Sequence, residues 1–107
     1  MLLFVYGTLK QDYSSHSKLK GSKYLGEATT ANPYLLLQST TKQFPFLVSV
    51  PVAPITGELY EINDSTLRSL DFYEGHPDYF KRILIPLTNN EEAWCYFYTQ
   101  LLPITTF

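Results

Sequence analysis

Residues 69–82 read SLDFYEGHPDYFKR, and this stretch ends the one helix that the sequence predicts clearly. The run Asn63-Asp64-Ser65 supplies N-cap side chains before it, and Gly75 with Pro77 stops it. The helix is therefore predicted over Ser65–Glu74. A strand-like run, Tyr79–Leu87, follows at once, so a short helix feeds directly into sheet structure.

Most of the remaining sequence predicts strands and turns. Apolar or alternating runs predict strands at Leu2–Tyr6, Lys23–Thr30, Tyr34–Gln38, Ile55–Ile62 and Ala93–Thr99. The turn signal Asn32-Pro33 predicts a hairpin-like connection between the strands on either side of it. Phe44–Val50 is apolar but contains proline, which predicts an edge strand or an irregular crossing. The polar segment Gln11–Lys20 predicts a loop with room for one helical turn.

The order of these elements indicates the fold class. Strands come first, one short helix comes late, and more strands follow, which is typical of an α+β domain on a mainly antiparallel sheet or small β-barrel. One or two short helices are expected. A length of 107 residues suits a single domain over residues 1–107.

The composition argues against several classes of function. The formal net charge is −2 without a block of Lys or Arg, so binding to nucleic acid or to an anionic membrane surface is not expected. Cys95 is the only cysteine and permits no intrachain disulfide. Neither a signal peptide nor a long apolar run is present, so we expect a cytoplasmic protein without a membrane segment. A small polar substrate suits this chain best.

Two carboxylates continue the apolar face of the predicted helix. At about 100° per residue, Leu67, Leu70, Asp71 and Glu74 fall within one core-facing stripe. Glu74 also lies at the helix C-terminus, where the macrodipole disfavours an anion. Partial burial and this dipole both raise a carboxyl pKa, as a general acid/base working near neutral pH requires.

Each carboxylate also has a purely structural interpretation. If the stripe runs instead through Leu70 and Tyr73, Glu74 is a solvated residue at the helix end. For Asp71 the structural interpretation is favoured, namely a local backbone bond or an ion pair with Arg82 or Lys81.

The segment VYGTLK, residues 5–10, places Gly7 where the first strand ends. Glycine permits positive φ, and successive free N–H groups in such a turn can bind a carboxylate or an oxyanion. On this motif alone an ordinary turn glycine is favoured, because neither GxxxxGK[ST] nor GxGxxG occurs in the chain.

The other chemically distinctive side chains favour structural roles. His16, His76 and Cys95 lack the spacing of metal ligands, so no metal site is predicted, and His76 is expected to be an exposed turn residue. In the last strand Trp94, Tyr96 and Tyr98 alternate with two apolar residues, a pattern that favours core packing over a stacking platform for bases.

Taken together, four segments resemble a known family in their order along the chain. VYGTLK (5–10), GELYEI (57–62), LDFYEGHPDYFKR (70–82) and WCYFYT (94–99) are similar to motifs of the γ-glutamylcyclotransferase-like (AIG2-like) family, most of all its small γ-glutamylamine cyclotransferases. The resemblance implies a small β-barrel with short helices. It implies an enzyme that needs no cofactor, in which the substrate's α-amine attacks its own γ-amide carbonyl and releases 5-oxoproline and an amine.

The resemblance also implies roles for individual residues and for the partner. Glu74 is the expected catalytic acid/base. The expected substrate-binding residues are Tyr6, Gly7, Thr8 and Leu9, through backbone amides, together with Tyr79 and Tyr98. The expected partner is a small γ-glutamyl molecule, and the protein is expected to be a monomer or a homodimer. The segments Gln11–Lys20 and Phe44–Pro54 would shape the leaving-group pocket, and neither identifies the leaving amine.

Two further hypotheses compete with the enzyme. A non-catalytic module would hold a γ-glutamyl or similar small carboxylate in the same pocket, although a nearby Glu74 would then repel the ligand's carboxylate. A purely structural interaction domain predicts that Glu74 points into solvent, far from the Gly7 turn.

Overall fold

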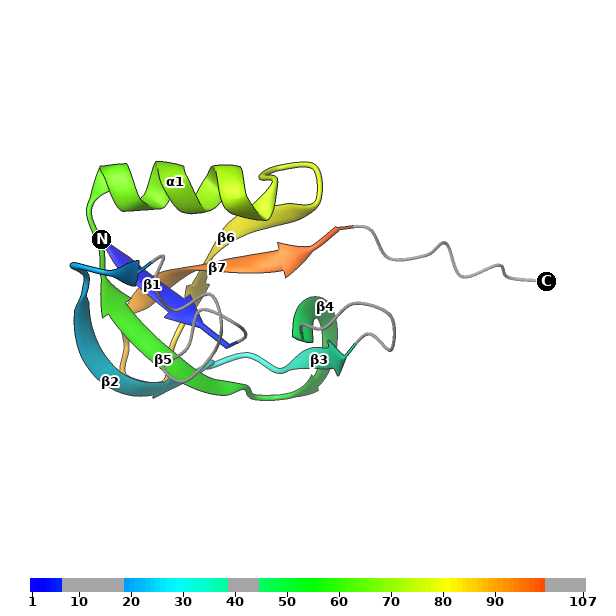
Figure 1. Ribbon diagram of the computed structural model, residues 1–107. Coiled ribbons are helices and arrows are strands. Elements are labelled where there is room, and N and C mark those ends of the chain that lie inside the picture. The colour runs from blue at the N-terminus through cyan, green and yellow to red at the C-terminus, as the bar shows by residue number, and fades with distance from the viewer. Residues whose placement is uncertain (7–18, 39–44, 100–107) are drawn as a thin grey trace.

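The computed structural model describes residues 1–6, 19–38 and 45–99, which form seven strands and one helix (Figure 1). In chain order these are β1 (Leu2–Val5), β2 (Lys23–Thr29), β3 (Tyr34–Gln38), β4 (Pro45–Ala53), β5 (Thr56–Glu61), α1 (Asp64–Glu74), β6 (Phe80–Pro86) and β7 (Glu92–Tyr98). The predicted α+β class is confirmed.

Two sheets carry these strands. One has five strands in the order β2-β5-β1-β7-β6, and the other consists of β3 and β4. All pairings are antiparallel except that of β1 with β7, which is parallel. The edge strands β2 and β6 meet at one end through a bridge between Thr30 and Leu87. Over the described residues they do not pair along their length, so closure into a barrel remains a prediction.

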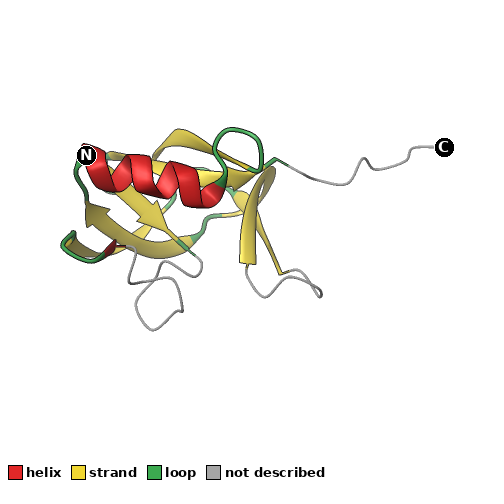
Figure 2. Cartoon of the chain, turned by 45° about the horizontal axis from the view of Figure 1, so that its top comes forward, coloured by secondary structure: helices red, strands yellow, loops and turns green. Residues whose placement is uncertain are grey.

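The helix α1 lies across one face of the five-stranded sheet, and the other face is also buried (Figures 1 and 2). Along β1, Leu3 and Val5 join Leu67 and Leu70 of α1 in one cluster, whereas Phe4 belongs to the cluster on the opposite face. The strand β7 alternates in the same way, with Tyr96 on the helix side and Cys95 and Phe97 on the other. Both strands are therefore buried on both faces, and the predicted core packing of the last strand is confirmed.

The helix agrees with its prediction except for one residue at its start. Asn63 caps it, accepting a hydrogen bond from the Thr66 N–H at 2.8 Å. Gly75 ends it in the left-handed conformation, at φ 69°, and donates to the Phe72 carbonyl. In the part of the chain that the structure describes, no helix has the length and apolar character needed to cross a membrane.

The predicted hairpin around Asn32-Pro33 is wrong. The strand β2 pairs with β5, and β3 pairs with β4 in the second sheet. The reason lies at Thr30, which is buried, accepts a hydrogen bond from the Ile55 N–H at 2.9 Å and donates to the Asn32 carbonyl at 2.7 Å. These bonds tie the end of β2 to the segment before β5, while Pro33 supplies no N–H for continued pairing.

The proline-containing segment was predicted to be an edge strand or an irregular crossing. It forms the strand β4, at the edge of the two-stranded sheet, so the first of these alternatives is confirmed. Its two prolines are accommodated differently. Pro45 is the first residue of the strand and lies opposite Gln38, whereas Pro51 lies where the register shifts between Tyr34 and Leu35, which leaves residues 49–52 outside the ladder.

Candidate active site

Three elements end together at one side of the molecule. The strands β1 and β7 are parallel, with Leu3 opposite Trp94, and α1 runs in the same general direction above them (Figure 1). Consequently Tyr6, which follows β1, lies at the same end as Glu74, the last residue of α1, and Tyr98, the last residue of β7. The predicted site residues Gly7, Thr8 and Leu9 lie outside the described residues.

The Tyr6 hydroxyl ties three strands together. It donates a hydrogen bond to the main-chain carbonyl of Tyr96 in β7 and accepts one from the Leu47 N–H of β4 at 3.2 Å. Burial raises the pKa of Tyr6 well above its ordinary value, electrostatic interactions with Cys95 and Glu74 raise it further, and the hydrogen bond from the Leu47 N–H lowers it in part. This hydroxyl is therefore protonated at neutral pH, and its proton is donated to the Tyr96 carbonyl.

The Glu74 charge acts on groups of the inner strands. The side chain is half-buried, and its charge adds to the effect of burial in raising the pKa of three groups below the helix: Tyr6, Cys95 and Tyr96. Tyr73, which the alternative stripe would bury, is 44% exposed. The helix thus presents Glu74, not Tyr73, on the side of β1 and β7.

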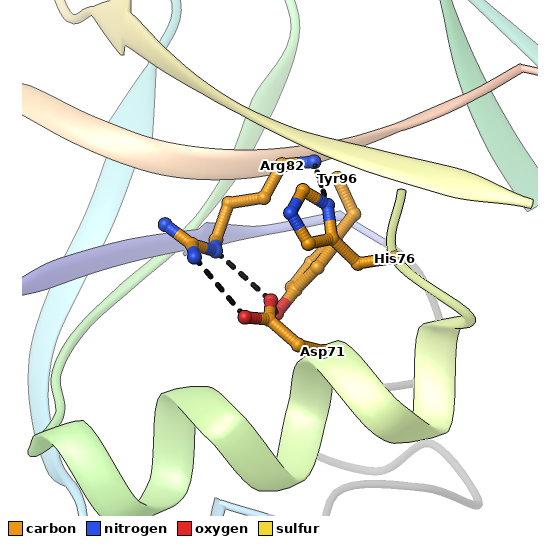
Figure 3. Close-up of polar contacts among 4 residues, drawn as sticks. All are labelled: Asp71, His76, Arg82 and Tyr96. Atoms are coloured by element: carbon orange, nitrogen blue, oxygen red, sulfur yellow. Dashed lines mark hydrogen bonds and ion pairs between the residues drawn. The ribbon is translucent and has the colours of Figure 1, made fainter. Parts of the chain in front are cut away.

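Asp71 has the structural role that the sequence favoured. Its carboxylate accepts hydrogen bonds from Arg82 Nε at 2.9 Å, Arg82 Nη2 at 3.0 Å and the Tyr96 hydroxyl at 2.6 Å (Figure 3). Burial alone would raise the pKa of Asp71, but the hydrogen bonds from Arg82 and Tyr96, with the charges of Arg82 and His76, lower it below its ordinary value. The predicted pairing with Arg82 is confirmed.

His76 differs from its prediction. The side chain is half-buried, and its Nδ1 accepts a hydrogen bond from the Arg82 main-chain N–H at 3.0 Å (Figure 3). The turn after Gly75 folds back along the helix end, which brings the imidazole onto β6. The Arg82 guanidinium in turn lies 4.3 Å from the centre of the Trp94 ring.

The two other predicted tyrosines flank the same end of the molecule. Tyr98 packs against Phe46 of β4 and Phe80 of β6, with ring centres 4.7 and 5.3 Å apart. Tyr79 is 61% exposed, and its ring covers Gly75, where a Cβ atom would lie 2.9 Å from Tyr79 Cδ2. The Tyr79 ring is therefore beside the C-terminus of α1, and the Tyr98 ring lies between β4 and β6.

The sequence interpretation missed two contributions to this region. Phe46 and Leu47 bring the small sheet up to Tyr98 and Tyr6, and Tyr96 bonds both Asp71 and Tyr6. The alternation along β7 indicated the face of Tyr96 but not its polar partners. Among the residues that the structure describes, no three His, Cys, Asp or Glu side chains form a group that could hold a metal ion.

Fold and site together define a small α+β protein with a half-buried carboxylate beside the end of a central strand. The sequence profile described as gamma-glutamyl cyclotransferase, AIG2-like, matches residues 3–106. The chain belongs to this family.

Relatives and solved structures agree with this assignment. A protein of Methanocaldococcus jannaschii, provisionally named a gamma-glutamylcyclotransferase, is 36% identical over 104 residues, covering 92% of this chain and 84% of that protein. Gamma-glutamylaminecyclotransferase B of Danio rerio is 34% identical over 95% of this chain, which spans only 61% of that relative's length. The crystal structure of an AIG2-like protein from Mus musculus matches with a TM-score of 0.88 over 95% of this chain and 79% of that chain. At 24% identity this likeness shows the fold alone.

Proposed function

We propose that the protein is a γ-glutamyl cyclotransferase in which Glu74 is the general acid/base. Membership of the family supports the reaction class. The observation that carries the assignment of Glu74 is its position: it is half-buried at the end of α1, and its charge acts on Tyr6 at the end of β1. A carboxylate so placed acts on Tyr6, the first residue of the proposed substrate-binding set.

The proposed reaction is an intramolecular acyl transfer. The substrate's α-amino nitrogen attacks its γ-carbonyl carbon, the bond from that carbon to the amide nitrogen breaks, and the five-membered ring of 5-oxoproline closes. Glu74 takes the proton that the α-ammonium must lose and delivers one to the leaving amine, which is a poor leaving group without it. Nucleophile and carbonyl belong to one molecule, so the site needs mainly to hold the substrate in a folded shape. The proposed chemistry uses no cofactor.

The other proposed roles belong to substrate binding. Backbone N–H groups of Tyr6, Gly7, Thr8 and Leu9 would hold the γ-glutamyl group and stabilise negative charge on the carbonyl oxygen. Tyr79, whose ring covers Gly75 next to Glu74, and Tyr98 at the end of β7 would border the substrate. We further propose that residues 1–107 act as one domain of this kind.

Within the family, we propose the γ-glutamylamine branch. Relatives from Danio rerio at 34–35% identity carry the name gamma-glutamylaminecyclotransferase, which supports a γ-glutamyl amine as the substrate class. The leaving amine itself is not specified by this argument. The panel of substrates in the experiment below therefore varies that group.

The test is product release from a panel of γ-glutamyl amines with small, apolar and basic leaving groups, extended by γ-glutamyl dipeptides. We expect 5-oxoproline and the free amine in equal amounts from at least one of the amines. Thermal stabilisation by a panel member without any product would support the binding module instead. Neither product nor stabilisation with any member would contradict both.

A further inference from the structure

The polar cluster beneath α1 is more extensive than a simple ion pair requires. One Asp71 carboxylate accepts three hydrogen bonds, and the two side chains of the ion pair are only 18% (Arg82) and 20% (Asp71) exposed. Arg82 uses its guanidinium on Asp71 and on the face of Trp94, and its main-chain N–H on His76. Such a partly desolvated, multiply bonded pair holds its geometry far better than an exposed surface pair.

We infer that Asp71, Arg82 and the Tyr96 hydroxyl form a positioning device for Glu74, which fixes the last turn of α1 on the sheet and keeps the charge beside Glu74 balanced. As a statement about catalysis this rests on the proposed function. As a statement about Glu74 itself it can be tested without any substrate.

The geometric half of the inference follows from the spacing along the helix. Glu74 comes three residues after Asp71, so the two side chains lie on one face with Cβ atoms about 5–6 Å apart. Asp71 is bonded to β6 through Arg82 and to β7 through Tyr96. The carbonyl of the same Tyr96 accepts the hydrogen bond of Tyr6. Tyr96 therefore links the helix that carries Glu74 to Tyr6, at the end of β1.

The electrostatic half depends on which neighbouring groups carry charge. Among the described residues, the titratable and charged groups on the elements around this carboxylate pair are Tyr6, which follows β1; Asp64, Arg68 and Tyr73 of α1; Lys81 and Arg82 of β6; Glu92, Cys95, Tyr96 and Tyr98 of β7; and His76, Asp78 and Tyr79 of the turn after α1. Asp64, Arg68 and Glu92 are exposed, and the exposed Lys81 pairs with Phe97, which packs on the sheet face away from the helix. The described strand β4 contributes none. Burial raises the pKa of Tyr6, Cys95 and Tyr96, so these three are neutral at neutral pH.

Asp71 and Arg82 are the opposed charges of the bonded pair on the helix face that carries Glu74, and removing one of them exposes Glu74 to the other. Asp71→Asn leaves the Arg82 cation uncompensated, which favours the Glu74 carboxylate and lowers its pKa. Arg82→Gln leaves the Asp71 anion uncompensated, which disfavours the Glu74 carboxylate and raises the pKa of Glu74. A charge at this range shifts a pKa by about half to one unit. A purely structural pair would destabilise the fold in both variants without opposite shifts.

The experiment is direct titration of the Glu74 carboxyl carbon by NMR, assigned with Glu74→Gln, in the parent and in Asp71→Asn, Arg82→Gln and the double variant. We expect the Glu74 pKa to fall by about half to one unit in Asp71→Asn and to rise by a similar amount in Arg82→Gln. In the double variant it should return to near the parent value. Arg68→Gln and Asp64→Asn, exposed positions on the same helix, are the matched controls and should shift the Glu74 pKa far less. Shifts of the same sign, or no larger than in these controls, would overturn the inference.

Arg82→Lys keeps the inference testable if the charge-removing variants do not fold. Lysine preserves the charge but not the two-pronged bond, so the Glu74 pKa should stay near the parent value while kcat for 5-oxoproline release falls several-fold. Full kcat in Arg82→Lys would contradict the geometric half. A parent that releases no 5-oxoproline would refute the proposed function, whereas the NMR shifts would still decide the inference about Glu74.

Discussion

The hydroxyl of Tyr6 donates a hydrogen bond to the main-chain carbonyl of Tyr96. The same oxygen accepts the Leu47 N–H from the two-stranded sheet, so one side chain holds β1, β7 and β4 together next to Glu74. The geometry of the candidate site therefore depends on bonds between strands that are far apart in the sequence.

Tyr6→Phe should destabilise the protein by about 1–3 kcal/mol, because it leaves the Leu47 N–H and the Tyr96 carbonyl without this partner. Urea unfolding measures the change. Tyr24→Phe is the matched control. Because Tyr24 is 42% exposed, this variant should lose much less stability. Equal losses in the two variants would show that the Tyr6 hydroxyl contributes nothing specific.

Gly75→Ala should cost more stability than Gly21→Ala. Gly75 has φ 69° and Gly21 has φ 86°, so each substitution forces an alanine into the left-handed conformation, which is unfavourable. Only at Gly75 would the new Cβ meet another residue, Tyr79 Cδ2 at 2.9 Å, whereas Gly21 faces open space. We expect an additional loss of about 1–3 kcal/mol at Gly75 and a displaced Tyr79 ring. Thermal melting of both variants compares them, and a similar loss would argue against a tight Tyr79 contact.

The stability contribution of Asp71 should depend on pH. Its pKa is lower in the folded protein than its ordinary value of 3.8, so its contribution is present above that value and is lost as the pH falls through the folded pKa. At pH 7, Asp71→Asn should be less stable than the parent by about 2–4 kcal/mol, because the partly buried Arg82 loses its partner. The difference in the free energy of unfolding between the parent and Asp71→Asn, measured by urea unfolding, should become smaller below about pH 4. A difference that stays constant down to pH 2 would contradict this account.

Phe46→Ala should alter the preference for leaving amines. The Phe46 ring lies 4.7 Å from that of Tyr98 and brings β4 to the candidate site, so its removal opens space on that side. On the proposed function, kcat/KM for a bulky leaving amine relative to a small one should change by about 10-fold. Val52→Ala, at a 60% exposed position of the same strand, is the control. An unchanged ratio in Phe46→Ala would place the leaving group elsewhere.

Local signals in the sequence were sufficient for much of this fold. The cap at Asn63 and the stop at Gly75 predicted the helix to within one residue, because both depend on adjacent residues. Alternation along β7 predicted its two buried faces, since the period of a strand is independent of its partners. The hairpin at Asn32-Pro33 failed because the partner of β2 is decided by the buried Thr30 and by β5, which comes more than 25 residues later in the chain.

In the candidate site, too, the local features could be predicted from the sequence and the contacts between distant strands could not. The helical period placed Asp71 and Glu74 on one face and suggested Arg82 as a partner for Asp71, and the structure has that pair. The bonds of Tyr96 and the approach of β4 through Phe46 could not be predicted, because they join strands whose adjacency is a tertiary property. The proposed role of Glu74 rests on the family resemblance and on its half-buried position at the end of α1, and that of the turn after β1 rests on the resemblance.

The most direct test of the central claim is the rate of 5-oxoproline release by Glu74→Gln, which keeps the shape of the side chain and removes its titrating carboxylate. Glu92→Gln, at the exposed start of β7, is the matched control. We predict that Glu74→Gln folds normally and loses kcat/KM by about 10²–10⁴, while Glu92→Gln matches the parent. A folded Glu74→Gln variant with the parent's rate would contradict the account.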